Sequence, residues 1–388
     1  MIYLDHNATT RPAAEVLEEM TECLQQAWAN PSSMHEPGQA ARRVLSDARA
    51  RVAQLVGCRG AELVFTSGAT EANHMAVLGA LAVGATTGRR RLVLSAVEHP
   101  GLLALAQRLQ AEGTPVDLIP VDGDGRVSIA AASRLIGPDV ALVSMMGANN
   151  ETGVLMPVGE LAELAHRAGA LLHVDATQLL GKTAHRFDDS GADLWSVSAH
   201  KLHGPKGTGA LVVRKGLECP ALLSGRQERH RRGGTENLPG IVGFAAAAER
   251  AARTLAADVA GLQARQARLE AGLRAALPGV HIYGEGVARL PNTSCLRFGT
   301  LDAEPVLSRL ERAGVVASSG AACTAGGTQP SHVLLAMGEG AAQAKAAIRF
   351  SLGRDTTDDE IEQTIAAARR VIAPLLQPTP ASAETVAA

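Results

Sequence analysis

The chain has 388 residues and a formal net charge of −2, with 37 Lys and Arg residues against 39 Asp and Glu residues. This length allows one large and one small domain, and the balanced charge excludes a global basic field that would hold nucleic acid or an anionic membrane. No apolar run reaches the roughly 20 residues of a membrane-spanning helix, and the N-terminal MIYLDHNATT lacks the features of a signal peptide, so we expect a cytoplasmic protein.

Short β-rich runs alternate with amphipathic stretches between residues 60 and 215. The runs expected to form strands are ELVF (62–65), RLVLSAV (91–97), VDLIPV (116–121), VALVSMMG (140–147), LLHVDA (171–176), LWSVSAH (194–200) and GALVVR (209–214). The stretches expected to form helices are GATEANHMAVLGAL (68–81), GLLALAQRLQ (101–110) and VGELAELAHRAG (158–169). This alternation predicts an α/β fold with a mostly parallel sheet and crossover helices on both faces. Ligands bind such sheets at the carboxyl ends of the strands.

A long Ala-, Arg- and Leu-rich stretch from Pro239 to about Leu277 has helical spacing, and we expect it to form a hinge between domains. The segments after it alternate between strand and helix patterns: HIYG (281–284), TSCLRF (293–298), AEPVLSRLERAG (303–314), IRFSL (348–352) and a last helix near 357–376. They predict a smaller α+β domain. The expected division is a large domain at 12–250, a small domain at 1–11 and 251–376, and a disordered tail at 377–388.

Two polar motifs, HVDATQ (173–178) and SAHKLHGPKG (198–207), follow predicted strands. Asp175 and Lys201 would therefore lie at the same edge of the sheet. Taken alone, such a pair is more often a salt bridge or two separate solvated ends. In a desolvated site, however, the neutral Lys201 amine could form a Schiff base with an aldehyde, and a carboxylate facing a pyridine nitrogen keeps that nitrogen protonated. These two roles describe the cofactor pyridoxal 5′-phosphate.

The motif TSGATEAN (66–73) lies between a predicted strand and a predicted helix. Free N–H groups and the helix dipole at such a point attract an anion, which offers a seat for the cofactor's phosphate. Alone, the motif is more typical of ordinary helix capping by Ser67 or Thr70. Its order along the sheet strengthens the phosphate interpretation.

Two further motifs, VEHP (97–100) and MGANNETG (146–153), also follow predicted strands. His99 could lie over a planar ring, although a lone histidine is more often structural. Asn150 could bond to a ring oxygen or a substrate carboxylate, although Asn often forms an Asx-turn in such loops. Both interpretations remain open on the residues alone.

The cysteines occur singly and without a CxxC motif, which argues against a disulfide framework or a thiolate zinc site. Cys323 stands in SSGAACTAGG (318–327), among small residues instead of the large apolar neighbours of a buried thiol. It is either filler in a flexible loop or a nucleophile that must move, and glycines would let such a loop swing.

Eleven motifs, in order along nearly the whole chain, closely resemble the cysteine desulfurases of the nitrogen-fixation and iron–sulfur-cluster type, in the class V aminotransferase superfamily. They are YLDHNATT, NPSSMH, FTSGATEAN, EHP, NNETG, HVDATQ, SAHKLHGPKG, RRGGTEN, RLPNTS, SSGAACTAG and IRFSLGR. The resemblance implies a fold-type-I, pyridoxal-phosphate-dependent homodimer whose large domain holds a mostly parallel, seven-stranded sheet. It also implies an enzyme that removes sulfur from L-cysteine and releases L-alanine.

The resemblance assigns a role to each residue that falls in a family motif. Lys201 would bind the cofactor covalently, and His99 would stack on its ring and assist proton transfer. The residues implied to contact the ring or its oxygen are Asp175, Gln178 and Asn150. Those implied to hold the phosphate are Ala69, Thr70, Ser198 and His200, with Thr235 reaching the phosphate of the neighbouring subunit. Those implied to bind the substrate are Asn150 and Arg349.

In the same way, the resemblance makes Cys323 the nucleophile, on a mobile loop at about 318–330, that receives the sulfur as a persulfide. An iron–sulfur scaffold or another acceptor protein would then take it, for nitrogenase, general cluster assembly or tRNA thiolation. We expect no metal site, apart from Cys323 as a transient iron–sulfur ligand. The alternatives on the same scaffold are a selenocysteine lyase, a class V aminotransferase and a non-catalytic partner protein. Cys323 favours desulfuration over amino transfer, and Lys201 disfavours a non-catalytic role.

Overall fold

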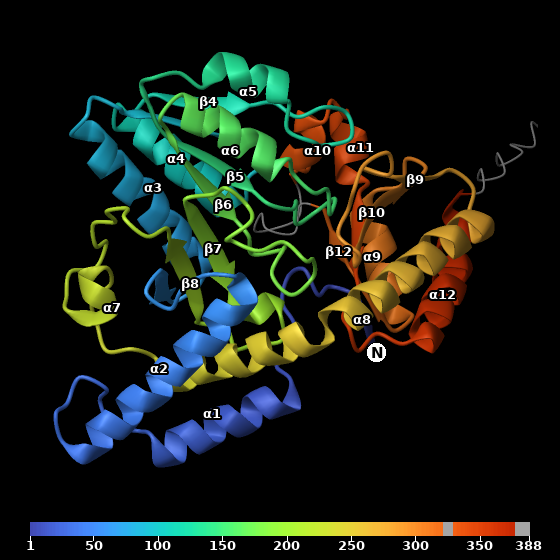
Figure 1. The fold of residues 1–388 in the computed structure, drawn as a ribbon. Coiled ribbons are helices and arrows are strands. Elements are labelled where there is room, and N and C mark those ends of the chain that lie inside the picture. Colours follow the sequence, from blue (N-terminus) through green and yellow to red (C-terminus); the bar gives the residue numbers. More distant parts are fainter. Residues whose placement is uncertain (321–328, 377–388) are drawn as a thin grey trace, which may run out of the picture.

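A seven-stranded sheet forms the centre of the larger part of the molecule, in a computed structural model that describes residues 1–320 and 329–376 (Figure 1). Its strand order is β2-β8-β7-β6-β5-β3-β4, and only β8 runs antiparallel to its neighbours. The strands are β2 (Leu63–Thr66), β3 (Arg91–Ser95), β4 (Val116–Ile119), β5 (Val140–Met146), β6 (Leu171–Asp175), β7 (Leu194–Ser198) and β8 (Gly209–Val213). The predicted fold class and the mostly parallel sheet are confirmed.

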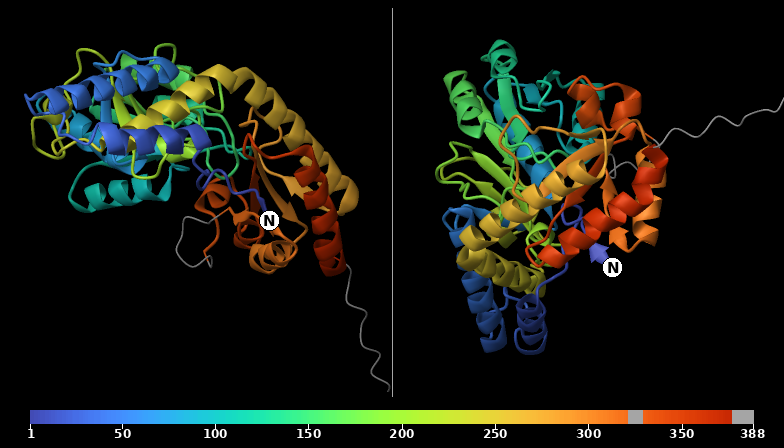
Figure 2. Two further views of the ribbon diagram at one scale, coloured as in Figure 1. Left: turned by 90° about the horizontal axis from the view of Figure 1, so that it is seen from below. Right: turned by 90° about the vertical axis from the view of Figure 1, so that its right-hand side faces the viewer.

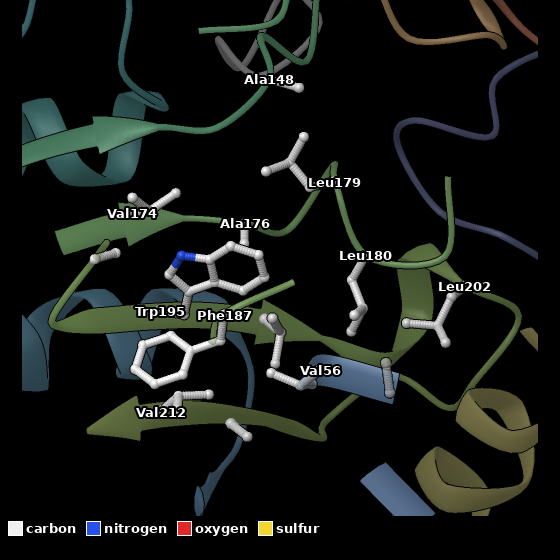
Figure 3. Packing of buried hydrophobic residues seen from close by; sticks show 14 of the residues in the cluster. Val56, Ala148, Val174, Ala176, Leu179, Leu180, Phe187, Trp195, Leu202 and Val212 are labelled. Atoms are coloured by element: carbon white, nitrogen blue, oxygen red, sulfur yellow. The ribbon is translucent and has the colours of Figure 1, made fainter. Parts of the chain in front are cut away.

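Helices cover both faces of this sheet, because the strands are apolar on both sides. All seven residues of β5 are buried, as expected for a strand between two helical layers. Helices α3 (Ala69–Ala85) and α4 (Pro100–Ala111) share one apolar cluster with the strands. The cluster on the opposite face includes residues of α2 (Glu36–Val56), α5 (Ile129–Leu135), α6 (Val158–Arg167) and α8 (Leu238–Ala276), among other helices. In that second cluster, the Trp195 ring meets the Phe187 ring edge-on with centroids 6.1 Å apart (Figure 3).

The first 60 residues contain two helices for which the sequence analysis gave no expectation. Helix α1 (Ala14–Gln26) and α2 both pack against α8. His35 caps α2, because its Nδ1 accepts a hydrogen bond from Gly38 N at 3.2 Å. The left-handed Gly57 ends the same helix.

A four-stranded sheet of order β12-β13-β10-β9 forms the smaller part. Its strands are β9 (Val280–Ile282), β10 (Thr293–Phe298), β12 (Ser318–Ser319) and β13 (Ile348–Ser351). The N-terminal strand β1 (Ile2–Tyr3) pairs in parallel with β11 (Val315–Val316) beside it. Helices α9 (Ala303–Arg312) and α12 (Asp358–Leu376) contribute to the apolar core of this smaller part. The remaining short helices are α7 (Gln227–His230), η1 (Ala199–Lys201), α10 (His332–Ala336) and α11 (Ala341–Lys345).

Helix α8 connects the two parts as one continuous helix of 39 residues (Figure 2). Its apolar residues in the large core lie between Leu238 and Ala251, and those in the small core are Leu262, Leu269 and Leu273. The division into 12–250 and 1–11 with 251–376 stays a prediction, since the large core also takes in Tyr283, Leu290 and Val333. Within the described ranges, no helix combines the length and apolar character needed to cross a membrane.

Candidate active site

A cavity of about 730 Å³ lies at the carboxyl edge of the large sheet. Strands β3, β5, β6 and β7 run in the same direction, and β2 shares it because the antiparallel β8 separates it from β7. Their carboxyl ends therefore meet at one edge. The sequence-predicted residues that line the cavity are Ala69, Thr70, His99, Asn150, Asp175, Gln178, Ser198, His200, Lys201 and Arg349. Residues that also line it but were given no role from sequence include Asn7, Ala8, Asn73, Thr177 and Lys206.

Asp175, the last residue of β6, presents a buried carboxylate to the cavity. Its Oδ1 accepts a hydrogen bond from Thr177 N at 3.0 Å, and its Oδ2 accepts one from Asn73 Nδ2 at 2.8 Å. Asn73 lies in the first part of α3, 102 residues away in sequence. Two donors on one buried carboxylate fix its orientation.

Lys201 lies in the short turn η1 that directly follows β7, the strand next to β6. Its Nζ donates hydrogen bonds to Asn7 O at 2.7 Å and Ala8 O at 2.8 Å. The N-terminal segment therefore forms one wall of the cavity and holds the amine in place. This contact uses backbone oxygens, which leave no mark in a sequence.

The N-terminus of α3 forms another part of the cavity lining, where the first-turn N–H groups of Ala69 and Thr70 have no acceptor within the helix. Gly209 lets β8 approach this point closely, because a Cβ there would lie 2.7 Å from Gly68 Cα. Ser198 and His200 line the same cavity. Burial, together with the charges of Lys201, Lys206 and Lys182, lowers the pKa of His200 to about 4. This part of the lining thus offers neutral donors and a helix dipole that favours an anion.

His99 caps helix α4, because its Nδ1 accepts a hydrogen bond from Gly101 N at 3.1 Å. This bond leaves the proton of the neutral ring on Nε2. Burial lowers the pKa of His99; Asp175 acts in the opposite direction, and Lys201 and His332 lower it further. A neutral imidazole ring therefore faces the cavity.

Arg349 enters the cavity from the smaller sheet, on β13. Its side chain is 2% exposed, with Nη2 2.6 Å from Asp5 Oδ1 and Nη1 2.9 Å from Asn150 O. The site consequently draws on both sheets. The guanidinium is held at two points and still borders the cavity, which suits it to bind a carboxylate there.

Two buried acids behind the cavity were not singled out from the sequence. Burial, together with the charge of Asp175, raises the pKa of Glu98 well above its usual range, although the bond from Met146 N lowers it. Burial raises the pKa of Glu151 to about 7, against the lowering effects of Ser331 and Arg349. Ser331 Oγ donates to Glu151 Oε2 at 2.5 Å.

Two predicted residues lie elsewhere. Thr235 is exposed and does not line the cavity of its own chain. Cys323 lies outside the described residues.

The cavity has the features that pyridoxal 5′-phosphate requires. A carboxylate and a lysine amine stand at the ends of neighbouring strands, and the N-terminus of a 17-residue helix faces the same space. These groups match a pyridine nitrogen, an aldehyde and a phosphate, respectively. The residues present therefore fit this cofactor.

Residues 2–364 match the family model of the class-V aminotransferases, and the chain belongs to that family. The cysteine desulfurase of Cereibacter sphaeroides is 47% identical over 388 residues, which cover 99% of each chain. Cysteine desulfurase NifS of Azotobacter vinelandii is 40% identical and is matched over 98% of this chain and 94% of its own. Within the class-V aminotransferases, the chain thus belongs to the cysteine desulfurases, and the family resemblance is confirmed.

Solved structures of this family share the fold. A NifS-like protein superimposes with a TM-score of 0.89 at 34% identity, covering 95% of this chain and 98% of its own. A NifS-like protein from Rickettsia africae gives a TM-score of 0.86 at 30% identity, covering 96% and 99%. The similarity therefore extends over both parts of the molecule.

Proposed function

We propose that this protein is a pyridoxal-phosphate-dependent cysteine desulfurase that transfers sulfur from L-cysteine to Cys323 and releases L-alanine. The observation that carries the proposal is the meeting of Asp175, Lys201 and the N-terminus of α3 in one cavity. When bound, the cofactor supplies an electron sink that stabilises negative charge at the substrate's Cα.

Each wall of the cavity holds one part of the cofactor in this proposal. Lys201 would bind it covalently, and Asp175 would pair with its pyridine nitrogen. The α3 N-terminus, Ser198 and His200 would hold the phosphate, Gln178 and Asn150 would bond the ring oxygen, and His99 would stack on the ring. Thr235, which is exposed, reaches the phosphate site of a second copy in a homodimer.

Lys201 and Arg349 act on the substrate from opposite parts of the site. Arg349 binds the carboxylate of L-cysteine, with Asn150 beside it. Lys201 takes the proton from Cα, and the carbonyl oxygens of Asn7 and Ala8 hold its amine ready for that step. The buried position of Arg349 keeps water away from the carboxylate and so strengthens the ion pair.

The sulfur step is a displacement in which the thiolate of Cys323 attacks the sulfur atom of the substrate. The Cys323 thiolate attacks the sulfur of L-cysteine, the new S–S bond forms, and the Cβ–S bond breaks with its electron pair left on carbon. Protons then return to Cβ and Cα to give L-alanine, so L-cysteine and one enzyme thiol become L-alanine and one enzyme persulfide. Ser318, close before Cys323 in sequence, pairs with Arg349 across β12 and β13, which supports Cys323 acting beside the substrate.

The persulfide then passes to a sulfur-acceptor protein, and we propose an iron–sulfur scaffold in the cytoplasm as that acceptor. Relatives named for nitrogen fixation, such as NifS of Azotobacter vinelandii, support a role in nitrogenase maturation. Co-purification with a scaffold protein from cells grown with and without fixed nitrogen would test this choice of acceptor.

The test of the activity is incubation of the loaded protein with L-cysteine, with alanine and protein persulfide measured together. We expect both products in the wild type, neither in Lys201→Ala, and no persulfide delivery to an acceptor in Cys323→Ala. Cys58→Ala is the matched control, because burial raises the pKa of this thiol to about 12 and makes it inert. Full alanine formation by Lys201→Ala would overturn the mechanism. Consumption of a 2-oxo acid instead of persulfide formation would favour an aminotransferase.

A further inference from the structure

Lys182 is a buried lysine behind the cavity, in the turn that follows β6. Lys182 is 6% exposed, whereas lysines are almost never fully buried. Burial lowers the pKa of Lys182 well below its usual range, and the charges of Lys201 and Arg349 lower it further. A buried amine is costly unless its hydrogen bonds are made, so its contacts indicate its role.

The Lys182 amine makes two hydrogen bonds to side chains of the site. Its Nζ donates to Asn7 Oδ1 at 2.9 Å and to Gln178 Oε1 at 2.5 Å. A neutral amine has two N–H groups, so these two acceptors use both of them. The arrangement therefore matches the neutral form that burial favours.

Through these bonds, Lys182 sets the orientation of the Gln178 carboxamide. Oε1 faces the Lys182 donor, and Nε2 donates to Asn7 O at 3.1 Å. A flipped amide would place Oε1 against the carbonyl oxygen of Asn7. The unflipped amide keeps a second N–H, and Gln178 lines the cavity. Gln178 is thus fixed as a donor.

Asn7 links the same bonds to Lys201. Its carbonyl oxygen receives both Gln178 Nε2 and Lys201 Nζ, the latter at 2.7 Å. Its side-chain oxygen receives Lys182 and also Asn292 Nδ2 at 3.1 Å. Asn7 is 1% exposed, so no solvent replaces these contacts.

We propose that Lys182 is a positioning residue that fixes Gln178 as a hydrogen-bond donor to the ring oxygen of the cofactor. This inference rests on the proposed function, since Gln178 must face pyridoxal 5′-phosphate. Lys182 itself touches neither the substrate nor the reacting atoms in this proposal.

The experiment is a double-mutant cycle on cofactor affinity, measured by absorbance titration of the full-length apo-protein with pyridoxal 5′-phosphate. The proteins compared are the wild type, Lys182→Met, Gln178→Ala and the double variant. Lys182→Met should weaken binding about five- to tenfold, the effect of roughly one lost hydrogen bond. In the Gln178→Ala background, the same substitution should change affinity by less than about twofold. Lys215→Met, at an exposed lysine, should bind like the wild type.

Three outcomes would overturn the inference: unchanged affinity in Lys182→Met, an equal loss with and without Gln178, or an equal loss in Lys215→Met. Thermal unfolding of each protein shows how far Lys182→Met destabilises the fold. A purely structural effect would be the same with Gln178 present and in the Gln178→Ala background. If Lys182→Met does not fold, Lys182→Leu, which also removes the donor, takes its place in the cycle. A wild type that fails to bind pyridoxal 5′-phosphate would contradict the proposed function instead.

Discussion

Replacing Arg349 with lysine tests the proposed substrate site most directly, because lysine keeps the charge and removes the planar fork. Arg349 holds Asp5 through Nη2 and Asn150 O through Nη1 while it borders the cavity. An ammonium group cannot keep both contacts and also grip a carboxylate with two bonds. We therefore expect the carboxylate of L-cysteine to lose at least one charge-assisted hydrogen bond.

The expected magnitude follows from that lost bond. A hydrogen bond to a charged group contributes about 1.5–3 kcal/mol, which corresponds to a roughly 10- to 150-fold weaker interaction. This should appear as a higher KM for L-cysteine in alanine-formation assays with Arg349→Lys. Inhibition by cysteamine, which has the thiol and amine but no carboxylate, should change by less than about twofold.

A matched control separates this effect from general damage to the fold. Arg289 forms a similar two-bond pair with Glu270 at 2.8 and 3.0 Å, and Arg289 does not line the cavity. Arg289→Lys should lower thermal stability and leave the KM unchanged. The reasoning is refuted if Arg349→Lys keeps the wild-type KM, or if cysteamine inhibition weakens as much as L-cysteine binding.

Three other changes test the buried surroundings of the site. Asn73→Ala removes the bond at 2.8 Å to Asp175, so pyridoxal 5′-phosphate affinity by titration should fall about tenfold; wild-type affinity would contradict the role of this bond. Gly209→Ala should lower the free energy of unfolding by about 2 kcal/mol in urea, because its Cβ would lie 2.5 Å from Val197 O. Gly159→Ala is the control: the space around its Cβ in helix α6 is open, so this change should not destabilise the protein. Glu151 has its pKa raised from 4.5 to about 7, so the folded state holds this proton to higher pH than the unfolded chain. The free energy of unfolding should therefore fall by about 3 kcal/mol from below pH 4.5 to above pH 7, and Glu151→Gln should remove this slope in urea melts at several pH values.

The strands and the residues at their ends were predictable because buried parallel strands leave a clear pattern. Apolar runs such as 140–147 end in polar residues, and the carboxyl ends of β2, β3, β5, β6 and β7 each contribute side chains to the cavity. Asp175 and Lys201 follow the rule, since the carboxyl edge of the sheet brings distant motifs together. Arg349 did not follow from any strand-end pattern of the large sheet. It came from the family resemblance, because nothing in the sequence alone tells how the smaller sheet meets the larger one.

The contacts made by the N-terminal segment could not be predicted, and the physical reasons differ for each. Asn7 and Ala8 hold Lys201 through carbonyl oxygens, a group that every residue carries. Lys182 has the sequence character of an exposed loop lysine, yet it is buried and bonded to Asn7, 175 residues earlier in the chain. Pairing of β1 with β11 in the smaller part brings that segment there. The inner wall of the site thus depends on how the two parts meet. Substitutions in β1 should therefore lower cofactor affinity more than they lower the stability of the large sheet.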